Sequence, residues 1–293
     1  MIIVNLKGGM GNQMFQYSLG LYLSMKYNVP LKLDVRSLLN RDMDSQITFR
    51  DYQLDVFGID LDRPTNFELW KFGMGISNEK YRNRFLSILD RISPKVYKEQ
   101  GFSFNNKVNE IGSDIYLDGY WQSEKYFYNI APLIRQKFNV VTSHSQSTND
   151  LADLISSQTS VCVNVRRTDY INNSLHQTTD VEYYIAALKV LRSRINDELN
   201  IYIFSDDAQW CEENLFLSKN QVIVDDKFSG FKFSSKFWLM MNCKHFIIPN
   251  SSFAWWAAWL STYENKVVIG PRKWLGDSKI NTSDIWPAGW ISI

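Results

Sequence analysis

The sequence has few cysteines, few histidines and almost no net charge. Its three cysteines show no paired or Cys-x-x-Cys spacing, which predicts free thiols in a reducing compartment. The 32 Lys and Arg residues against 31 Asp and Glu create no global field, so we expect no nucleic-acid partner and only local anion binding. His144, His176 and His245 are too dispersed to indicate a zinc site.

Long apolar runs are also missing. Residues 1–6 are apolar but carry no basic segment and no small-residue cleavage site, and no stretch approaches the length of a membrane span. We therefore expect a cytoplasmic protein and leave open a peripheral association with the inner membrane. Aromatic residues are abundant, with 10 Trp, 15 Tyr and 18 Phe. Most should fill cores, although sugar faces also pack on such rings.

The pattern along the chain predicts an α/β protein. An apolar strand at 2–6, a glycine-rich turn at 7–13 and an apolar helix through Tyr27 precede a second strand at 31–35. The polar segment 142–150 reads as an inter-domain linker. Asp180 and Ser234 are predicted helix caps. Beyond the linker, helical patterns separate β-branched runs at 161–165, 201–204, 222–224, 246–248 and 267–269.

Polar clusters follow three of these runs. Because ligands of an open α/β sheet bind outside the carboxyl ends of its strands, the clusters predict one composite site. Arginine presents a planar fork suited to a diphosphate, and a helix start supplies hydroxyls and free N–H groups for an anion. The clusters are Arg166-Arg167-Thr168-Asp169-Tyr170, Ser205-Asp206-Asp207 and Asn250-Ser251-Ser252-Phe253.

Each cluster also has a structural interpretation. The arginines can pair with surface acids such as Asp169. Ser251 can simply cap a buried helix, in which Trp255 and Trp256 pack rather than hold sugar. The pair Asp206-Asp207 is equally consistent with ribose binding and with helix capping. The Asp-x-Asp patterns at 42–44 and 60–62 read as solvated loops rather than a metal site.

Five motifs in order make the chain resemble the bacterial alpha-1,2-fucosyltransferases of glycosyltransferase family 11. The resemblance implies an inverting, metal-independent enzyme that moves fucose from GDP-fucose to a terminal galactose of a glycan. The fold would be GT-B-like, with two Rossmann-like domains facing a central cleft: residues 1–144 on the acceptor side and 145–293 holding GDP-fucose. No other cofactor is implied. The motifs are 8–17 (GGMGNQMFQY), 119–124 (GYWQSE), 165–170 (VRRTDY), 204–207 (FSDD) and 245–256 (HFIIPNSSFAWW).

The resemblance also suggests roles for individual residues. Arg166 would contact the diphosphate, and Asn12 would position reactants. Asn164 stands where the family usually has His, and an amide can hydrogen-bond a phosphate or guanine edge but cannot carry charge. Acceptor contacts would come from Gln13, Tyr120 and Trp121. The full set of expected donor-binding residues is Asn164, Arg166, Arg167, Asp169, Ser205, Asp206, Asp207, His245, Asn250, Ser251, Ser252 and Phe253.

Two other functions fit parts of the sequence. A dinucleotide-dependent oxidoreductase would use the glycine turn together with Asp34 as its ribose-binding acid. Met14 stands where that fingerprint needs a third glycine, and the arginine and serine clusters would have no role. A non-catalytic glycan-binding protein is suggested by the aromatic content alone.

Overall fold

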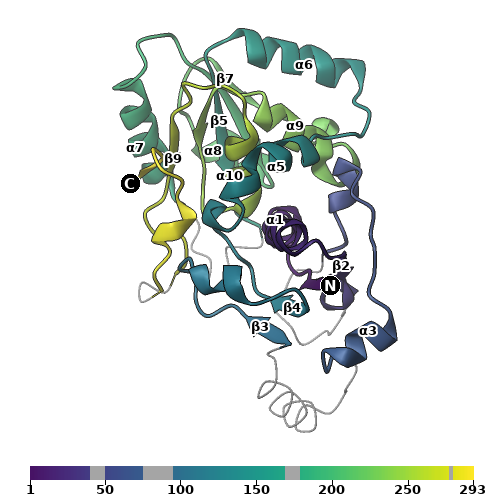
Figure 1. Ribbon diagram of the computed structural model, residues 1–293. Helices are drawn as coiled ribbons and strands as arrows, with labels where there is room; N and C mark the ends of the chain where they lie inside the picture. Colours follow the sequence, from purple (N-terminus) through teal and green to yellow (C-terminus); the bar gives the residue numbers. More distant parts are fainter. Residues whose placement is uncertain (40–49, 75–94, 169–178, 277–279) are drawn as a thin grey trace. The chain divides into compact units, whose positions relative to one another are not determined.

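The computed structural model describes residues 1–39, 50–74, 95–168, 179–276 and 280–293 (Figure 1). The chain forms two compact units. Unit 1 comprises 1–55, 59–137 and 283–285, and unit 2 comprises 56–58, 138–282 and 286–293. The predicted domains, 1–144 and 145–293, differ from these units at 56–58, 138–144 and 283–285. Among the described residues, no helix is both long enough and apolar enough to cross a membrane.

Unit 1 contains a parallel sheet of order β2-β1-β4-β3. The predicted strands at 2–6 and 31–35 are confirmed as β1 (Ile2–Asn5) and β2 (Leu31–Asp34). The segment between about 40 and 100 gave no readable order in the sequence. Helix α2 (Arg36–Leu39) precedes this segment. The described residues after position 49 in unit 1 and its boundary supply η1 (Leu54–Phe57), α3 (Asn66–Lys71), β3 (Val96–Lys98), η2 (Asn106–Glu110), β4 (Ile115–Asp118), η3 (Glu124–Tyr126), η4 (Tyr128–Ile130) and α5 (Ala131–Lys137).

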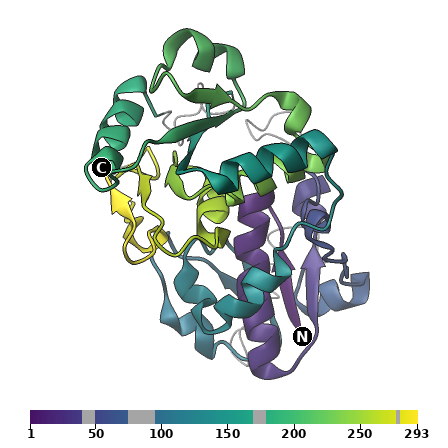
Figure 2. The ribbon, with the colours of Figure 1, turned by 90° about the horizontal axis from the view of Figure 1, so that it is seen from above.

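Helix α1 (Met10–Tyr27) covers this sheet and lies along β1 and β2 (Figure 2). Glycine is required at two positions, one in the turn before α1 and one where α1 packs on the sheet. Gly8 has φ +77°, and a side chain there would collide with Asn12. A Cβ on Gly20 would collide with Val4 and Leu31, so the helix can pack this closely only because position 20 carries no side chain.

Unit 2 contains a six-stranded parallel sheet of order β10-β9-β8-β5-β6-β7. All five strands predicted in this half of the sequence are confirmed to within about one residue. Strands β5, β8 and β9 are buried throughout, which explains their continuous apolar runs, since strands covered on both faces need not alternate. The strands are β5 (Ser160–Val165), β6 (Asn200–Ser205), β7 (Gln221–Ile223), β8 (His245–Ile247), β9 (Val268–Gly270) and β10 (Ile291–Ser292).

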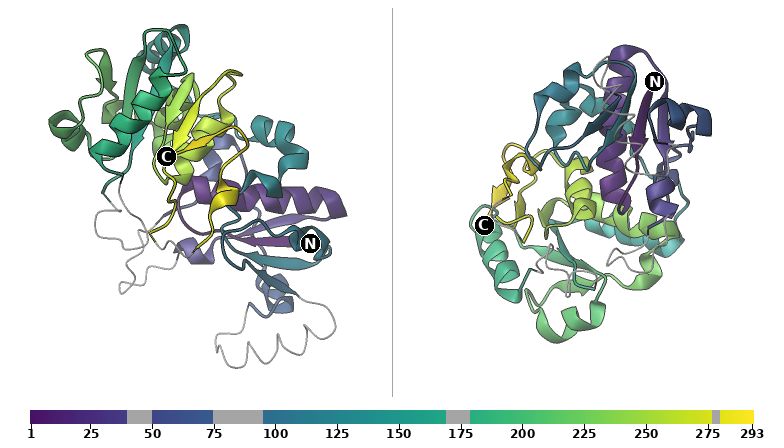
Figure 3. Two further views of the ribbon diagram at one scale, coloured as in Figure 1. Left: turned by 90° about the vertical axis from the view of Figure 1, so that its left-hand side faces the viewer. Right: turned by 90° about the horizontal axis from the view of Figure 1, so that it is seen from below.

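The α-helices of unit 2 are α6 (Gln146–Ser157), α7 (Val181–Arg192), α8 (Ala208–Asn214), α9 (Ser234–Met241) and α10 (Ser252–Leu260), and its 3-10 helices include η5 (Asp226–Phe228) and η6 (Phe231–Phe233). The 3-10 helix η7 (Ser283–Ile285) belongs to unit 1. Helix α7 packs beside the strands (Figure 3), and its predicted inner face of Tyr184, Ala187, Leu188 and Leu191 is buried. Asp180 caps α7 as predicted, because its side chain accepts a hydrogen bond from the Tyr183 N–H.

Two local predictions were wrong. Residues 146–150 belong to α6 rather than to a linker, because Ser145 accepts the Thr148 N–H and starts a helix in a polar sequence. Ser234 does not cap α9. The residue before the helix is Phe233, in a left-handed conformation, and the Ser234 hydroxyl instead accepts a hydrogen bond from Thr142 at 2.8 Å.

Candidate functional site

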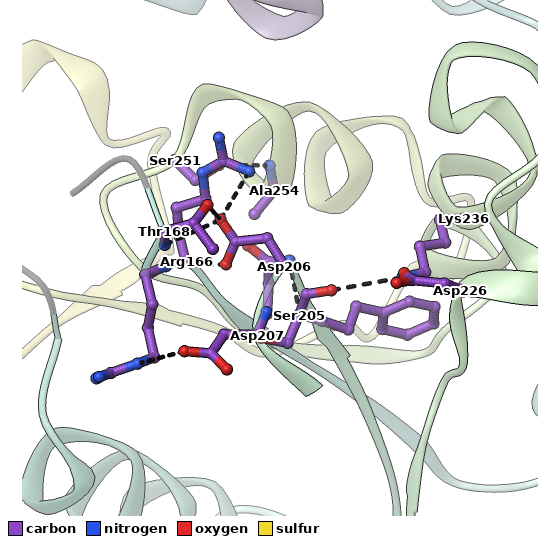
Figure 4. Close-up of polar contacts among 12 residues, drawn as sticks. Arg166, Thr168, Ser205, Asp206, Asp207, Asp226, Lys236, Ser251 and Ala254 are labelled. Carbon is purple, nitrogen blue, oxygen red and sulfur yellow. Dashed lines mark hydrogen bonds and ion pairs between the residues drawn. The ribbon is translucent and has the colours of Figure 1, made fainter. Parts of the chain in front are cut away.

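The three predicted polar clusters gather at one end of the unit 2 sheet. Strand β5 pairs with β6 on one side and β8 on the other, all in parallel. Arg166 follows β5, Asp206 follows β6 and Ser251 follows β8. The three clusters therefore lie at the carboxyl ends of neighbouring strands. This placement is the one that binds ligands in open α/β sheets. The hydrogen bonds and ion pairs of the group are drawn in Figure 4.

Asp206 organises the turn that follows β5. Its carboxylate accepts the backbone N–H groups of Arg167 at 2.9 Å and Thr168 at 3.2 Å, and the Thr168 hydroxyl at 2.6 Å. Oδ2 of the same carboxylate lies 3.1 Å from a terminal nitrogen of Arg166 (Figure 4). Asp206 therefore fixes the turn and orients the Arg166 guanidinium, whose side chain keeps 28% of its surface exposed.

The two arginines of the doublet have different environments. Arg167 Nε lies 3.3 Å from Asp207, and its guanidinium carbon is 3.8 Å from the centre of the Trp210 ring. Asp207 also caps α8 by accepting the Trp210 N–H at 3.1 Å. Capping, one of the two predicted roles of this aspartate pair, is thus confirmed for Asp207. Pairing with Asp169 is not tested, since that residue and Tyr170 lie outside the described residues.

The serine cluster begins helix α10. Ser251 is the N-cap, with its side chain accepting the Ala254 N–H, and Ser252 is the first helical residue. Trp255 and Trp256 are fully buried, as predicted. Phe253 packs on Phe237, with ring centroids 5.0 Å apart. The start of α10 thus presents hydroxyls and backbone N–H groups beside Arg166, at the end of the adjacent strand.

Two further predicted residues donate side-chain hydrogen bonds to backbone carbonyls, one within the sheet and one between the segments that follow β8 and β9. Asn164 Nδ2 donates to the Phe204 carbonyl at 3.0 Å, which ties β5 to β6 just before the arginines. Asn250 Nδ2 donates to the Trp274 carbonyl at 3.1 Å. Both residues are largely buried, so they hold the backbone next to the arginine and serine clusters in place.

The structure removes His245 from the donor set. This residue starts β8 and pairs in register with Val161 near the start of β5, at the amino end of the sheet. Its Nδ1 accepts the Val267 N–H at 3.1 Å, and burial is the main cause that lowers its pKa. The sequence placed His245 in a motif with Ser251, but a strand separates them.

In unit 1, Asn12 lies in the first turn of α1, where its Oδ1 accepts a hydrogen bond from Gln122 at 2.7 Å. Gln13 is fully buried. Its amide donates to the carbonyls of Gly8 and Asp51 and accepts the Gln53 N–H. These bonds anchor the glycine turn to residues 51–53, so Gln13 as found here supports the turn and exposes nothing to an acceptor.

The predicted acceptor residues Tyr120 and Trp121 also differ from each other. Tyr120 is half-buried, whereas Trp121 is 1% exposed and stacks on Tyr97 at 5.9 Å. The Trp121 backbone is left-handed, with φ +56°, an unusual conformation for a bulky residue. Its indole N–H has no hydrogen-bond partner among the described residues.

Charged residues that the sequence reasoning missed surround Tyr120. Lys7, after β1, pairs with Asp118, the last residue of β4, at 2.9 Å, and lies 4.9 Å from the Tyr120 ring centre. Glu99, after β3, accepts the N–H groups of Tyr120 at 2.6 Å and Trp121 at 2.9 Å. Burial raises the pKa of Glu99, whereas for Asp118 the effect of burial is outweighed by Lys7, which lowers that pKa. The signal in the sequence is that these charged residues stand at the ends of strands. It was not used, because β3 and β4 were not recognised.

The residues predicted for rival functions are engaged elsewhere. Asp34 has a 3% exposed side chain that binds Arg36 at 2.7 Å and the Tyr116 hydroxyl at 2.8 Å, so it is not available to a ribose. Within the described ranges, no three His, Cys, Asp or Glu side chains are grouped as a metal site. Asp42, Asp44 and His176 fall outside those ranges.

The two units together have a GT-B-like fold. Each unit is a parallel α/β sheet, and one carries an arginine and a helix start at its carboxyl end. A variant of Arabidopsis thaliana FUT1 in complex with GDP is similar in structure, with a TM-score of 0.51 at 10% identity, covering 93% of this chain and 71% of that one. At that identity the likeness concerns the fold alone.

The sequence identifies the family. The model of glycosyl transferase family 11 matches residues 88–293, and the chain belongs to this family. It is 32% identical over 301 residues to an alpha-1,2-colitosyltransferase of Escherichia coli, covering 100% of this chain and 98% of the relative. It is 30% identical over 307 residues to the O-antigen biosynthesis glycosyltransferase WbnK of Escherichia coli, covering 98% and 99%. Nothing in these matches supports an oxidoreductase or a non-catalytic glycan-binding protein.

Proposed function

We propose that this glycosyltransferase moves L-fucose from GDP-fucose to a terminal galactose in alpha-1,2 linkage, with inversion and without a metal. One observation carries the proposal: the Arg166–Asp206 pair and the start of α10 lie at the carboxyl ends of neighbouring strands in unit 2. Family membership and the alpha-1,2 linkage in the name of a full-length relative support it.

The proposed donor site acts on the leaving group. As the bond to the anomeric carbon breaks, negative charge grows on the β-phosphate of GDP. Arg166 would donate two hydrogen bonds to that phosphate, while Asp206 holds the guanidinium in place. Ser251, Ser252 and the first N–H groups of α10 would add donors that need no rearrangement during the reaction.

Other donor contacts would orient the nucleotide. Ser205 and Asp207, at the end of β6, stay candidates for ribose contacts, although Asp207 already caps α8 and holds Arg167. Phe253, through its contact with Phe237, and Asn250, through its bond to the Trp274 carbonyl, would hold the start of α10 in place.

The acceptor would bind at the carboxyl end of the unit 1 sheet. Asn12 and Tyr120 are both partly exposed there and accompany the Lys7–Asp118 pair. Carboxylate and amide groups hydrogen-bond sugar hydroxyls, and a tyrosine ring can pack on a pyranose face. An oligosaccharide of the O-antigen type is the proposed acceptor, because WbnK is named for that pathway. We further propose a cytoplasmic enzyme, with peripheral association with the inner membrane as an open prediction.

A second donor has specific support. The relative that matches the whole chain at 32% identity is named a colitosyltransferase, so GDP-colitose is the alternative to GDP-fucose. The two donors share the nucleotide and differ in the sugar. Initial rates with each donor at equal concentration would decide between them, and faster transfer of colitose would replace the sugar in our proposal.

A nucleotide panel tests the proposal as a whole. A ligand that binds only the folded state must raise the melting temperature, so GDP should stabilise the protein more than UDP, ADP or NAD. Incubation with GDP-fucose and a galactose-terminated glycan should then yield an alpha-1,2-linked product. Selective stabilisation by NAD would restore the oxidoreductase, and glycan binding without any nucleotide response would favour the glycan-binding protein.

A further inference from the structure

A buried lysine lies next to the proposed donor site. Lys236, in the first turn of α9, is 6% exposed. Its ammonium group donates to Asp226 Oδ1 at 2.6 Å and lies 3.4 Å from the Ser205 carbonyl oxygen (Figure 4). Ser205 directly precedes Asp206, so this ion pair adjoins the cluster that holds Arg166.

The pair is asymmetric in its exposure. The Asp226 side chain is 84% exposed, whereas that of Lys236 is 8% exposed. An ammonium group is costly to bury, and an apolar residue would suit a helix that contains Phe237 and Leu239 far better. Lys236 binds the Asp226 carboxylate through Oδ1, and the Asp226 side chain is otherwise largely exposed to solvent. The arrangement thus presents a fixed carboxylate outward.

The carboxylate also has a suitable position. Asp226 follows β7, which is separated from β5 by β6 alone. Two strand spacings correspond to roughly 10 Å, a span that suits a ribose and a base beyond a phosphate held at Arg166. The crevice at this end of the sheet would therefore place phosphate, ribose and base over β5, β6 and β7 in turn.

We propose that Asp226 recognises the guanine base of the donor and that Lys236 positions the Asp226 carboxylate; this rests on the proposed function. A carboxylate offers two acceptors in one plane. The guanine edge offers two matching donors, N1–H and the exocyclic N2 amino group. Adenine has a lone pair at N1, which would face the carboxylate and be rejected. The preference of the enzyme for guanine would thus arise from the exposed carboxylate of Asp226, which the buried ammonium group of Lys236 holds in place.

The test compares nucleotides by calorimetry. Inosine diphosphate lacks the N2 amino group and should bind the unaltered protein about tenfold more weakly than GDP, the loss of one charge-assisted hydrogen bond. Asp226→Asn should weaken GDP by roughly tenfold to a hundredfold. It should also bring the ratio of the GDP and inosine diphosphate affinities close to one. ADP should gain relative affinity, because an asparagine amide matches the adenine edge.

Two further variants separate recognition from folding. Asp225→Asn changes the neighbouring acid, which caps η5 through the Lys227 N–H at 3.2 Å, and asparagine caps equally well. It should leave all three affinities unchanged. Lys236→Met removes the ammonium and should reduce the preference for GDP over inosine diphosphate by severalfold, which a purely structural lysine would not do.

The outcomes are distinct. If the unaltered protein binds GDP but Asp226→Asn keeps the same preference over inosine diphosphate, the inference is wrong and the proposed function stands. If the unaltered protein does not bind GDP at all, both are wrong. Should Asp226→Asn fail to fold by circular dichroism, N1-methyl-GDP decides on the unaltered protein. At least a tenfold loss supports the inference, and equal binding refutes it.

Discussion

Arg166→Lys separates geometry from charge in the proposed donor site. The guanidinium is held by Asp206 at 3.1 Å and is 28% exposed, so it is oriented yet still accessible to a ligand. Lysine keeps the positive charge but presents a point charge instead of a planar fork. Loss of a donor aimed at growing transition-state charge typically costs a hundredfold or more in turnover, roughly 2.7 kcal/mol of activation free energy.

The assay measures turnover and binding separately. Initial rates at saturating GDP-fucose should fall by about a hundredfold, while the dissociation constant for GDP rises much less, because ribose and base contacts remain. Arg167→Lys is the matched control. Arg167 pairs with Asp207 and lies over Trp210, so its replacement should lower the free energy of unfolding by about 1 kcal/mol. Turnover should change far less than in Arg166→Lys.

Three results would refute this reasoning. A fully active Arg166→Lys enzyme would reduce Arg166 to a general electrostatic role. Equal losses of turnover in both arginine variants would mean that the doublet acts as one unit. A variant of Arg166 that fails to fold would show that the pair with Asp206 holds the sheet end together.

Three other predictions follow from the same structure. Activity with GDP-fucose should survive excess EDTA, because arginine and a helix start replace a metal; loss that manganese or magnesium restores would contradict this. Asn12→Ala should reduce turnover about tenfold or more with little change in GDP affinity, whereas equal loss of both would move the glycine turn into the donor site. Asp34→Asn should lower the free energy of unfolding at pH 7 by about 2–3 kcal/mol, measured by urea titration.

The sheet of unit 2 could be predicted from the sequence because its central strands β5, β8 and β9 are buried on both faces. Apolar runs such as the one in β5 stand out against polar turns, and the residues after them necessarily share one end of a parallel sheet. Unit 1 was harder to predict. Strand β3 has the sequence Val-Tyr-Lys and is only partly buried, so it forms no apolar run that stands out from its surroundings.

The same distinction applies to the site. Arg166 and Ser251 were predictable, since each directly follows a recognisable strand. Gln13 and Trp121 were misleading, because a motif does not reveal that a polar or aromatic side chain points inward. Lys236 went unnoticed in the sequence, although a lysine within an apolar helical stretch is itself a signal of a buried charge with a partner.

Asp34 stands where a dinucleotide-binding protein would have its ribose-binding acid, yet its role here is structural. That role has a testable pH dependence. Burial alone would raise its pKa, but hydrogen bonds from Arg36 and Tyr116 outweigh this and lower it. A carboxyl whose pKa is lower in the folded state stabilises the fold above its unfolded pKa, about 3.9, and loses that contribution as the pH falls through the folded pKa. The difference in unfolding free energy between the natural protein and Asp34→Asn should therefore be constant from pH 7 to about pH 5 and shrink in more acidic solution.

Asp114→Asn is the control, because that side chain is 52% exposed and its ion pairs should contribute little. A difference that grows as the pH falls would show that Asp34 is not held as an ionised acid.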